Sequence, residues 1–140
     1  MKQIEVVAAI IICNEKILCM QRGKGKFDYI SFKYEFPGGK IETSETLTCA
    51  LEREIKEEME IEIIVSQSDY FNTIKHKYPD FEITMHAFIC KINEERFSRN
   101  EHVNHVWANL SDLNNLDWAA ADLPIVEKLI SEGENFGIKR

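Results

Sequence analysis

The sequence predicts an α+β fold, in which one helix interrupts a series of β-strands and a second helix follows the last strand. Residues 4–13 and 81–92 are rich in apolar and β-branched side chains, which is typical of strands. Residues 47–58 instead begin with apolar side chains at helical spacing, and residues 119–131 show a wide apolar helical face. This order of elements indicates helices packed against a sheet.

The chain before the first helix contains four predicted elements. They are a buried strand at residues 4–13, its hairpin partner at 16–21, a glycine- and lysine-rich loop at 22–33 and a short strand at 34–36. Gly38 and Gly39 then form a turn, because glycine permits backbone conformations that other residues avoid.

The first helix is expected to begin with Thr43 or Ser44 as its N-cap. That start places Glu45 in the first turn, where the helix dipole favours an anion. The apolar stripe that starts at Leu47 reaches positions 54 and 58 at helical spacing, and both are glutamate.

Glu54, Glu57 and Glu58 therefore share one helix face, three and four residues apart. Like charges at this spacing repel, and burial without compensation is costly. A divalent cation that prefers oxygen ligands, Mg2+ or Mn2+, would offset both effects. The alternative is a solvated acidic face, since glutamate-rich helices are common, and the helical pattern by itself does not decide between the two interpretations.

The chain after this helix contains eight further predicted elements. They are two strand pieces within residues 62–74 that break near 66–68, a turn at 75–80, a strand at 81–92, a polar loop at 93–100, a strand containing Trp107, a short helical turn from Ser111 and a helix at 119–131. His86 is expected to be a hydrogen-bonded sheet residue, and His102 with His105 lacks the cysteine pair of a typical zinc site.

Composition narrows the classes of protein. With 140 residues the chain suits one domain, residues 1–140, and a net charge of −7 argues against binding a nucleic-acid polymer. The four cysteines show no CxxC spacing, so neither a disulfide framework nor a cysteine metal site is expected. Neither a signal-peptide pattern nor a stretch long enough to span a membrane is found, which predicts a cytoplasmic protein without a membrane partner.

One segment resembles the Nudix box, GX5EX7REUXEEXGU, at all but one position. The matching residues are Gly39, Glu45, Arg53, Glu54, Ile55, Glu57, Glu58 and Ile61. The wider similarity covers about residues 4–129 and is to MutT-like members, closest to the bacterial CTP pyrophosphohydrolase and 8-oxo-dGTP diphosphatase types. The resemblance implies an α/β/α sandwich in which a mixed β-sheet lies between helices.

The one departure from the motif is Glu60, which occupies the position of the second motif glycine. A glycine just past a helix end usually adopts a left-handed cap, and glutamate in the same backbone costs about 1 kcal/mol. We therefore expect an altered helix end. Position 60 faces away from Glu54 and Glu58, so this departure is not expected to remove the chemistry.

The resemblance implies a metal site and its supporting residues. The implied Mg2+ ligands are the carboxylates of Glu54, Glu57 and Glu58 and the carbonyl of Gly38. Arg53 is expected to orient these carboxylates with Glu45 as its partner, and Gly39 to give structural support. Glu101, six residues before Trp107, is implied as a further metal ligand or general base. Its alternative is an exposed loop residue.

The resemblance also implies residues that contact substrate. Arg22 is expected to contact a phosphate. Asp122 is expected to accept a hydrogen bond from an exocyclic amine or from a guanine edge, and its alternative role is the N-cap of the last helix. Tyr34, Phe36 or Trp118 would stack on the base, with a core role as the alternative for each.

The implied activity is Mg2+-dependent hydrolysis of a nucleoside triphosphate to the monophosphate and pyrophosphate. The substrate would be a pyrimidine nucleotide such as CTP or dCTP, or a modified or oxidised nucleotide. One alternative is an ADP-ribose or nucleotide-sugar hydrolase, although such enzymes often carry an N-terminal extension that this sequence lacks. A catalytically silent nucleotide-binding domain is the other. Either a monomer or a homodimer is compatible with the sequence.

Overall fold

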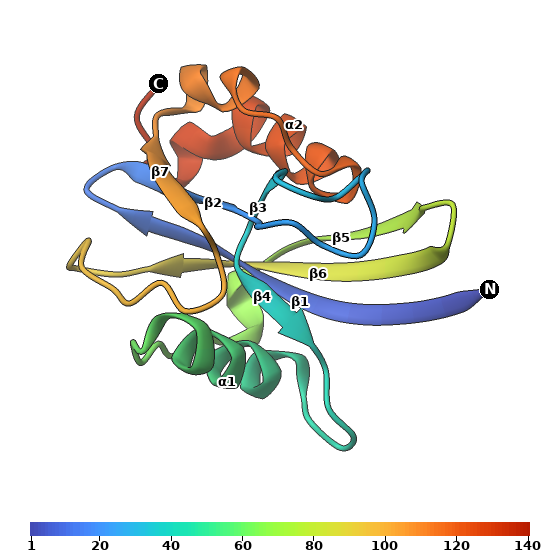
Figure 1. The fold of residues 1–140 in the computed structure, drawn as a ribbon. Helices are drawn as coiled ribbons and strands as arrows, with labels where there is room; N and C mark the ends of the chain where they lie inside the picture. The colour runs from blue at the N-terminus through green and yellow to red at the C-terminus, as the bar shows by residue number, and fades with distance from the viewer.

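The seven strands form one mixed sheet that lies between two helices (Figure 1). The computed structural model describes all residues, Met1–Arg140. The strands are β1 (Lys2–Cys13), β2 (Lys16–Gln21), β3 (Tyr34–Glu35), β4 (Gly38–Lys40), β5 (Tyr70–Lys77), β6 (Phe81–Lys91) and β7 (Asn104–Ala108). The helices are α1 (Leu47–Met59) on one face and α2 (Leu123–Glu132) on the other. The predicted sandwich is confirmed.

The strand order is β3-β2-β1-β6-β5, with β4 paired to β1 and β7 paired to β2. β1 and β6 run parallel from the Lys2–Phe81 pair to the Ile12–Lys91 pair, and the other pairs are antiparallel. Because β1 is covered on both faces, its sequence is a nearly continuous apolar run, as expected for a parallel strand inside a layered fold.

Successive residues of β1 divide between two hydrophobic cores. Ile10 packs into the core on the α2 side, and Ile11 packs into the core on the α1 side. From α1, the side chains of Leu51, Ile55 and Met59 fill the second core and are fully buried. This burial fixes which face of α1 is turned toward the sheet, and it therefore fixes where the glutamates lie.

The short segment between β3 and β4 crosses from one strand of the sheet to the neighbouring strand. β3 pairs with β2, whereas β4 pairs with β1, so the chain passes from one strand to its neighbour through Phe36 and Pro37. The Ala9 amide donates to the Pro37 carbonyl at 2.8 Å, which holds the crossing against β1. Glu35 therefore lies just before this crossing and the Gly38-Gly39 pair just after it, and β4 lies beside α1 in Figure 1.

The start of α1 differs from the prediction. Thr46 is the N-cap, and its hydroxyl accepts from the Cys49 amide at 3.2 Å. Glu45 thus precedes the helix and is not in its first turn. The reason is a turn just before the cap, in which the Glu45 side chain accepts from the Glu42 amide at 2.8 Å and Ser44 has a φ of 69°.

The end of α1 also differs from the prediction. Glu60 keeps the left-handed backbone of the motif glycine, with φ 56° and ψ 35°, and its amide donates to the Lys56 carbonyl. The prediction of an altered helix end is therefore wrong. Neighbouring contacts hold the backbone in this conformation, because the Asn100 amide group donates to Glu60 Oε2 at 3.2 Å and to the Glu57 carbonyl at 3.0 Å.

Three other predicted boundaries are wrong. No strand forms at residues 62–65, because the Val65 amide donates to the Glu52 carboxylate of α1 at 2.8 Å. β5 continues to Lys77, which shortens the following turn. α2 begins at Leu123 after a 3₁₀ turn at Ala120–Asp122, since Pro124 suits the first turn of a helix.

The predictions about the cysteines and His86 agree with the structure. All four cysteines are free, and three of them are buried as small apolar side chains. His86 bonds to Thr73 and Glu5 across neighbouring strands. None of the helices combines the length and apolar character needed to cross a membrane.

Candidate active site

The three glutamates of α1 share one face but lie at different depths. Glu58 is 8% exposed, the Glu54 side chain is 16% exposed and the Glu57 side chain is 60% exposed. The apolar stripe of the helix continues directly into Glu58, and the sheet covers it there. The predicted shared face is therefore present, and it runs from the protein interior to solvent.

Glu58 is a buried carboxylate beside other carboxylates. Its Oε2 accepts from the Gly38 amide at 3.1 Å, which ties α1 to β4. Burial, together with the charges of Glu54 and Glu35, raises the pKa of Glu58 to about 8. Ionised Glu58 is thus unfavourable unless a positive charge lies near it.

Arg53 holds the neighbouring carboxylates in place. Its Nε and Nη2 donate to the two oxygens of Glu45 at 2.6 and 2.9 Å, which is a bidentate pair. Its Nη1 donates to Glu54 at 2.9 Å and to Glu57 at 3.3 Å. The Arg53 hydrogen bonds lower the pKa of Glu45 to about 2, and the pair with Glu45 raises the pKa of Arg53. Arg53 and Glu45 therefore lie together as predicted.

As the side chains lie, no three acidic, histidine or cysteine residues are close enough to chelate a metal ion. Glu54 and Glu57 are directed to Arg53, whereas Glu58 is bonded to Gly38. Burial and the charge of neighbouring Glu57 and Glu101 raise the pKa of Glu54 as well, despite the opposing effect of Arg53. The donors are hard carboxylate oxygens that repel one another, which suits a divalent cation with a preference for oxygen ligands.

The two glycines of β4 allow α1 and β1 to approach β4 closely. A Cβ on Gly39 would collide with the Glu54 carboxylate, and a Cβ on Gly38 would collide with the Val7 carbonyl. Gly39 therefore supports the site by leaving space for a carboxylate, which gives a physical meaning to its predicted supporting role.

The loop before β7 brings Glu101 to the acidic face. Ser98 and Asn100 donate backbone hydrogen bonds to the Met59 and Glu58 carbonyls at 3.0 Å each. With the side-chain bonds of Asn100, these contacts attach the loop to the end of α1. Glu101 follows directly and lines the same cavity as the three glutamates of α1. The sequence contained no signal for the role of Asn100, since it arises from a contact between distant segments.

This polar cavity has a volume of about 630 Å³ and no hydrophobic residue in its wall. Its lining residues are Arg22, Gly23, Lys24, Gly25, Glu35, Gly38, Gly39, Lys40, Glu54, Glu57, Glu58, Glu101 and His102. The wall combines cations from the loop after β2 with carboxylates from α1. Such a mixture suits a polyphosphate together with divalent cations.

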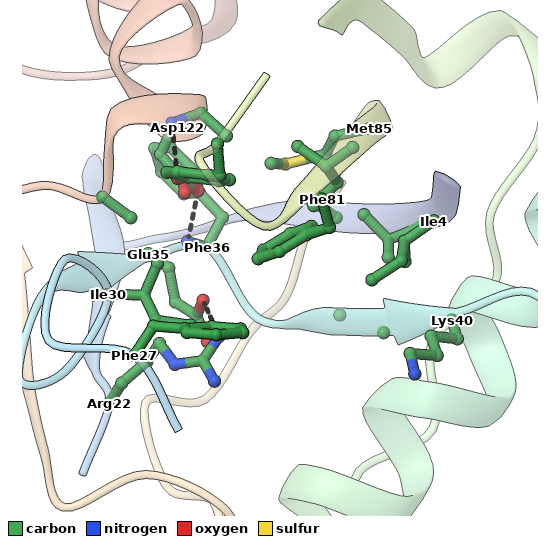
Figure 2. A pocket seen from close by; sticks show the side chains of 18 of the residues that line it. Ile4, Arg22, Phe27, Ile30, Glu35, Phe36, Lys40, Phe81, Met85 and Asp122 are labelled. Carbon is green, nitrogen blue, oxygen red and sulfur yellow. Dashed lines mark hydrogen bonds and ion pairs between the residues drawn. The ribbon is translucent and has the colours of Figure 1, made fainter. Parts of the chain in front are cut away.

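A second cavity of about 640 Å³ lies next to it and is mainly apolar (Figure 2). Phe27 and Phe81 lie in its wall with ring centroids 5.9 Å apart. Figure 2 also shows Ile4 and Met85 on the side of Phe81, and Asp122 beside Phe36 at the opposite end. The size and mixed wall suit a flat aromatic ligand held by a few polar groups.

Asp122 is a buried acid in the wall of the apolar cavity. Its Oδ1 accepts from the Phe36 amide at 3.1 Å, and its side chain makes no bond to the first turn of α2. It therefore occupies the N-cap position of α2 without capping the helix through its side chain. Burial and the charge of Glu35 raise the pKa of Asp122 well above its usual range. A protonated or strongly hydrogen-bonded Asp122 is favoured.

The other predicted substrate residues are only partly brought together. Phe36 lines the apolar cavity, and its ring stacks on Trp118 at 4.8 Å. Tyr34 and Trp118 line neither cavity and pack edge to face at 6.3 Å, so the structure gives them the core role. Arg22 lines both cavities and lies 3.4 Å from Glu35.

Sequence reasoning missed Glu35, His102 as its partner, Lys40 and Phe27 as residues of the site. Glu35 Oε2 lies 2.8 Å from His102 Nε2, and the His102 side chain is 3% exposed. Lys40 lines both cavities, and Phe27 lines the apolar one. For Glu35, the only signal in the sequence was its position two residues before Pro37, at the start of the glycine turn.

Comparisons with known proteins agree with this geometry. The family model described as the NUDIX domain matches residues 6–128. The chain is 34% identical to the CTP pyrophosphohydrolase of Escherichia coli over 131 residues, which is 94% of each chain. It is 31% identical to the 8-oxo-dGTP diphosphatase of E. coli over 130 residues, 92% of this chain and 98% of that protein.

Solved structures give the same result. The solution structure of the E. coli ORF135 protein has a TM-score of 0.80 at 33% identity and covers 96% of this chain and 94% of that one. The MutT structure from methicillin-resistant Staphylococcus aureus has a TM-score of 0.74 at 41% identity and covers 95% of this chain and 100% of that one.

Proposed function

This chain belongs to the Nudix family, and we propose that it is a Mg2+-dependent nucleoside triphosphate pyrophosphohydrolase that releases the monophosphate and pyrophosphate. As a Nudix hydrolase it acts on nucleotides. The observation that supports the finer assignment is the pair of adjacent cavities, one apolar and one polar, with five residues common to both walls. A nucleotide likewise combines a largely apolar base with a charged chain of phosphates.

The polar cavity suits the phosphates and the metal. Glu54, Glu57, Glu58 and Glu101, with the Gly38 carbonyl, are the groups that would hold Mg2+, and Mn2+ has similar requirements. The chemistry that Mg2+ supplies when bound is neutralisation of phosphate charge and acidification of water.

The protein's own groups perform the remaining tasks in the polar cavity. Arg53 limits the rotation of Glu54 and Glu57 through its hydrogen bonds to them, and Glu45 keeps Arg53 oriented in turn. Arg22 lies at the boundary of the two cavities, where it can pair with a phosphate oxygen. One of Glu54, Glu57 and Glu101 accepts the proton of the attacking water, because each is a carboxylate in or beside the reacting region.

The apolar cavity would receive the base. Phe81 offers a partly exposed ring, whereas Phe36 is 4% exposed and belongs to the core. Asp122 offers a second oxygen for which no hydrogen bond is present. Ionised, that oxygen accepts from an exocyclic amine such as N4 of cytosine. Protonated, it donates to a ring nitrogen or carbonyl of the base. The proposed substrates are therefore pyrimidine triphosphates such as CTP and dCTP, or modified and oxidised nucleotides.

The test is pyrophosphate release with Mg2+ across CTP, dCTP, 5-methyl-dCTP, 8-oxo-dGTP and dGTP. We expect one triphosphate to be turned over far faster than the others, and Glu58→Gln to abolish that activity. Glu62→Gln is the matched control, because Glu62 is an exposed glutamate close to the same helix.

ADP-ribose belongs in the same panel, with phosphate counted after phosphatase treatment. Hydrolysis of ADP-ribose alone would contradict the proposal and favour a diphosphate-linked substrate. A folded protein that hydrolyses nothing would instead indicate a nucleotide-binding domain.

A further inference from the structure

Glu35 lies where the two cavities meet. Both walls contain Arg22, Glu35, Gly38, Gly39 and Lys40. The negative charge of Glu35 also acts on both sides, since it raises the pKa of Glu58 in the polar cavity and of Asp122 in the apolar cavity. Figure 2 shows the Glu35 carboxylate beside the Arg22 guanidinium, between Phe36 and Phe27. We call the place where the two cavities meet, lined by these five shared residues, the junction, and Glu35 belongs to it.

The junction corresponds to one part of a nucleotide. If the base enters the apolar cavity and the phosphates enter the polar one, the furanose lies between them. This step rests on the proposed function. Arg22 and Lys40 attract phosphate, and the two glycines present only backbone. Among these five residues, Glu35 alone has a side chain that accepts hydrogen bonds, and its charge repels phosphate.

The carboxylate of Glu35 is held in place from two sides. Its Oε2 lies 2.8 Å from Nε2 of buried His102, and its Oε1 accepts from Arg22 Nη1 at 3.4 Å. A carboxylate has about four acceptor positions, so each oxygen can still accept a hydrogen bond. His102 Nδ1 is buried without a partner, so this ring has Glu35 as its only hydrogen-bond partner.

We propose that Glu35 determines sugar recognition by accepting a hydrogen bond from a furanose hydroxyl, and that His102 is the positioning residue that holds Glu35 for this contact. A hydroxyl bond to a charged acceptor changes affinity by about tenfold or more. The enzyme therefore selects nucleotides that carry the hydroxyl over analogues that lack it. The choice concerns the sugar and is independent of the choice of base.

The experiment compares four forms of the preferred triphosphate: ribose, 2′-deoxy, 3′-deoxy and 2′,3′-dideoxy. In the wild type, we expect kcat/KM for the dideoxy form to be lower than for the best form by about tenfold or more. Glu35→Ala should reduce that ratio to about twofold or less, and Glu35→Gln, which keeps the shape, should give an intermediate ratio. The 2′- and 3′-deoxy forms identify the hydroxyl concerned.

Asp80→Asn is the matched control, because Asp80 is another carboxylate in the wall of the apolar cavity but not at the junction. It should keep the wild-type sugar ratio. His102→Asn should lower the ratio, whereas a purely structural role for His102 would alter all four substrates equally. A wild type that does not discriminate, or a Glu35→Ala variant that lowers all four values by one factor, would overturn the proposal.

Failure of the proposed function would give a different result. If the wild type hydrolyses none of the triphosphates, calorimetry with the four cytidine and the four guanosine monophosphate analogues tests the sugar contact by itself. Loss of the hydroxyl preference in Glu35→Ala would support the contact. Equal affinities, or no binding of any analogue, would overturn it.

Discussion

Glu58 is a carboxylate that folding places in the interior. Between pH 4.5, the ordinary pKa of glutamate, and about 8, its folded-state value, the folded protein keeps a proton that the unfolded chain releases. The metal-free protein therefore loses stability as pH rises through this range. Below pH 4.5 both states are protonated and Glu58 contributes nothing to the pH dependence.

Glu58→Gln should therefore stabilise the metal-free protein at pH 8.5 by about 2–4 kcal/mol, because the amide needs no proton. The gain should shrink toward zero near pH 4.5. Urea unfolding in EDTA at several pH values measures it. Exposed Glu57→Gln is the control and should stay within about 0.5 kcal/mol of the wild type. A gain independent of pH would contradict the assignment.

Gly39 is required because of the Glu54 carboxylate that lies against it. Gly39→Ala should cost about 1–3 kcal/mol and most of the activity, since the added Cβ displaces that carboxylate. In a Glu54→Ala background the same substitution should cost much less, because the obstructing group is gone. Thermal or urea unfolding of the four proteins gives the coupling energy. Equal costs in both backgrounds would show that the collision is unimportant.

At the scale of elements, the end of α1 and the loop before β7 stabilise each other. Asn100 bonds to the Glu57 carbonyl and the Glu60 side chain, and Glu60 keeps a left-handed backbone. The strain of about 1 kcal/mol at Glu60 is therefore offset by its side-chain hydrogen bond with Asn100, which glycine could not make. The same contacts place Glu101 at the acidic face.

Asn100→Ala should cost about 1 kcal/mol in stability and lower kcat more than its small stability effect explains, because Glu101 loses its attachment. Asn93→Ala, at an exposed asparagine of the same loop, is the control. Unfolding curves and steady-state kinetics at saturating Mg2+ separate the two effects. Unchanged kcat in Asn100→Ala would show that Glu101 is positioned without this contact.

At the scale of the whole molecule, excess negative charge makes stability depend on cations. The chain has a net charge of −7, and several of its carboxylates gather around one cavity. A cation bound there stabilises the folded state by mass action.

Mg2+ at 10 mM should raise the Tm of the wild type, and NaCl at the same ionic strength should not. The shift should be larger at pH 8 than at pH 6, because Mg2+ competes with the proton of Glu58, whose pKa is about 8. Differential scanning fluorimetry measures both effects. A shift in Glu58→Gln as large as in the wild type would place the cation elsewhere.

The sequence by itself determined that helices pack against a sheet and that three glutamates share one face of α1. β1, β2, β6 and α1 have apolar patterns strong enough to be recognised locally, and the spacing of Glu54, Glu57 and Glu58 follows from helical geometry alone. The pairing of Arg53 with Glu45 was also predictable, because the resemblance carries both residues. These features depend on residues that are near one another in the chain.

Tertiary structure alone decided the remaining features of the site. Glu35 meets His102 across 67 residues, Asp122 meets Phe36 across 86, and Asn100 meets Glu60 across 40. The contacts of Glu35 and Phe36 depend on how β3 and β4 divide between two strands, and no local pattern encodes that division. The same holds for Glu60, whose left-handed backbone is stable because a distant loop bonds to it. Local periodicity reports which face is buried, whereas the partner on that face is set by the packing of the whole chain.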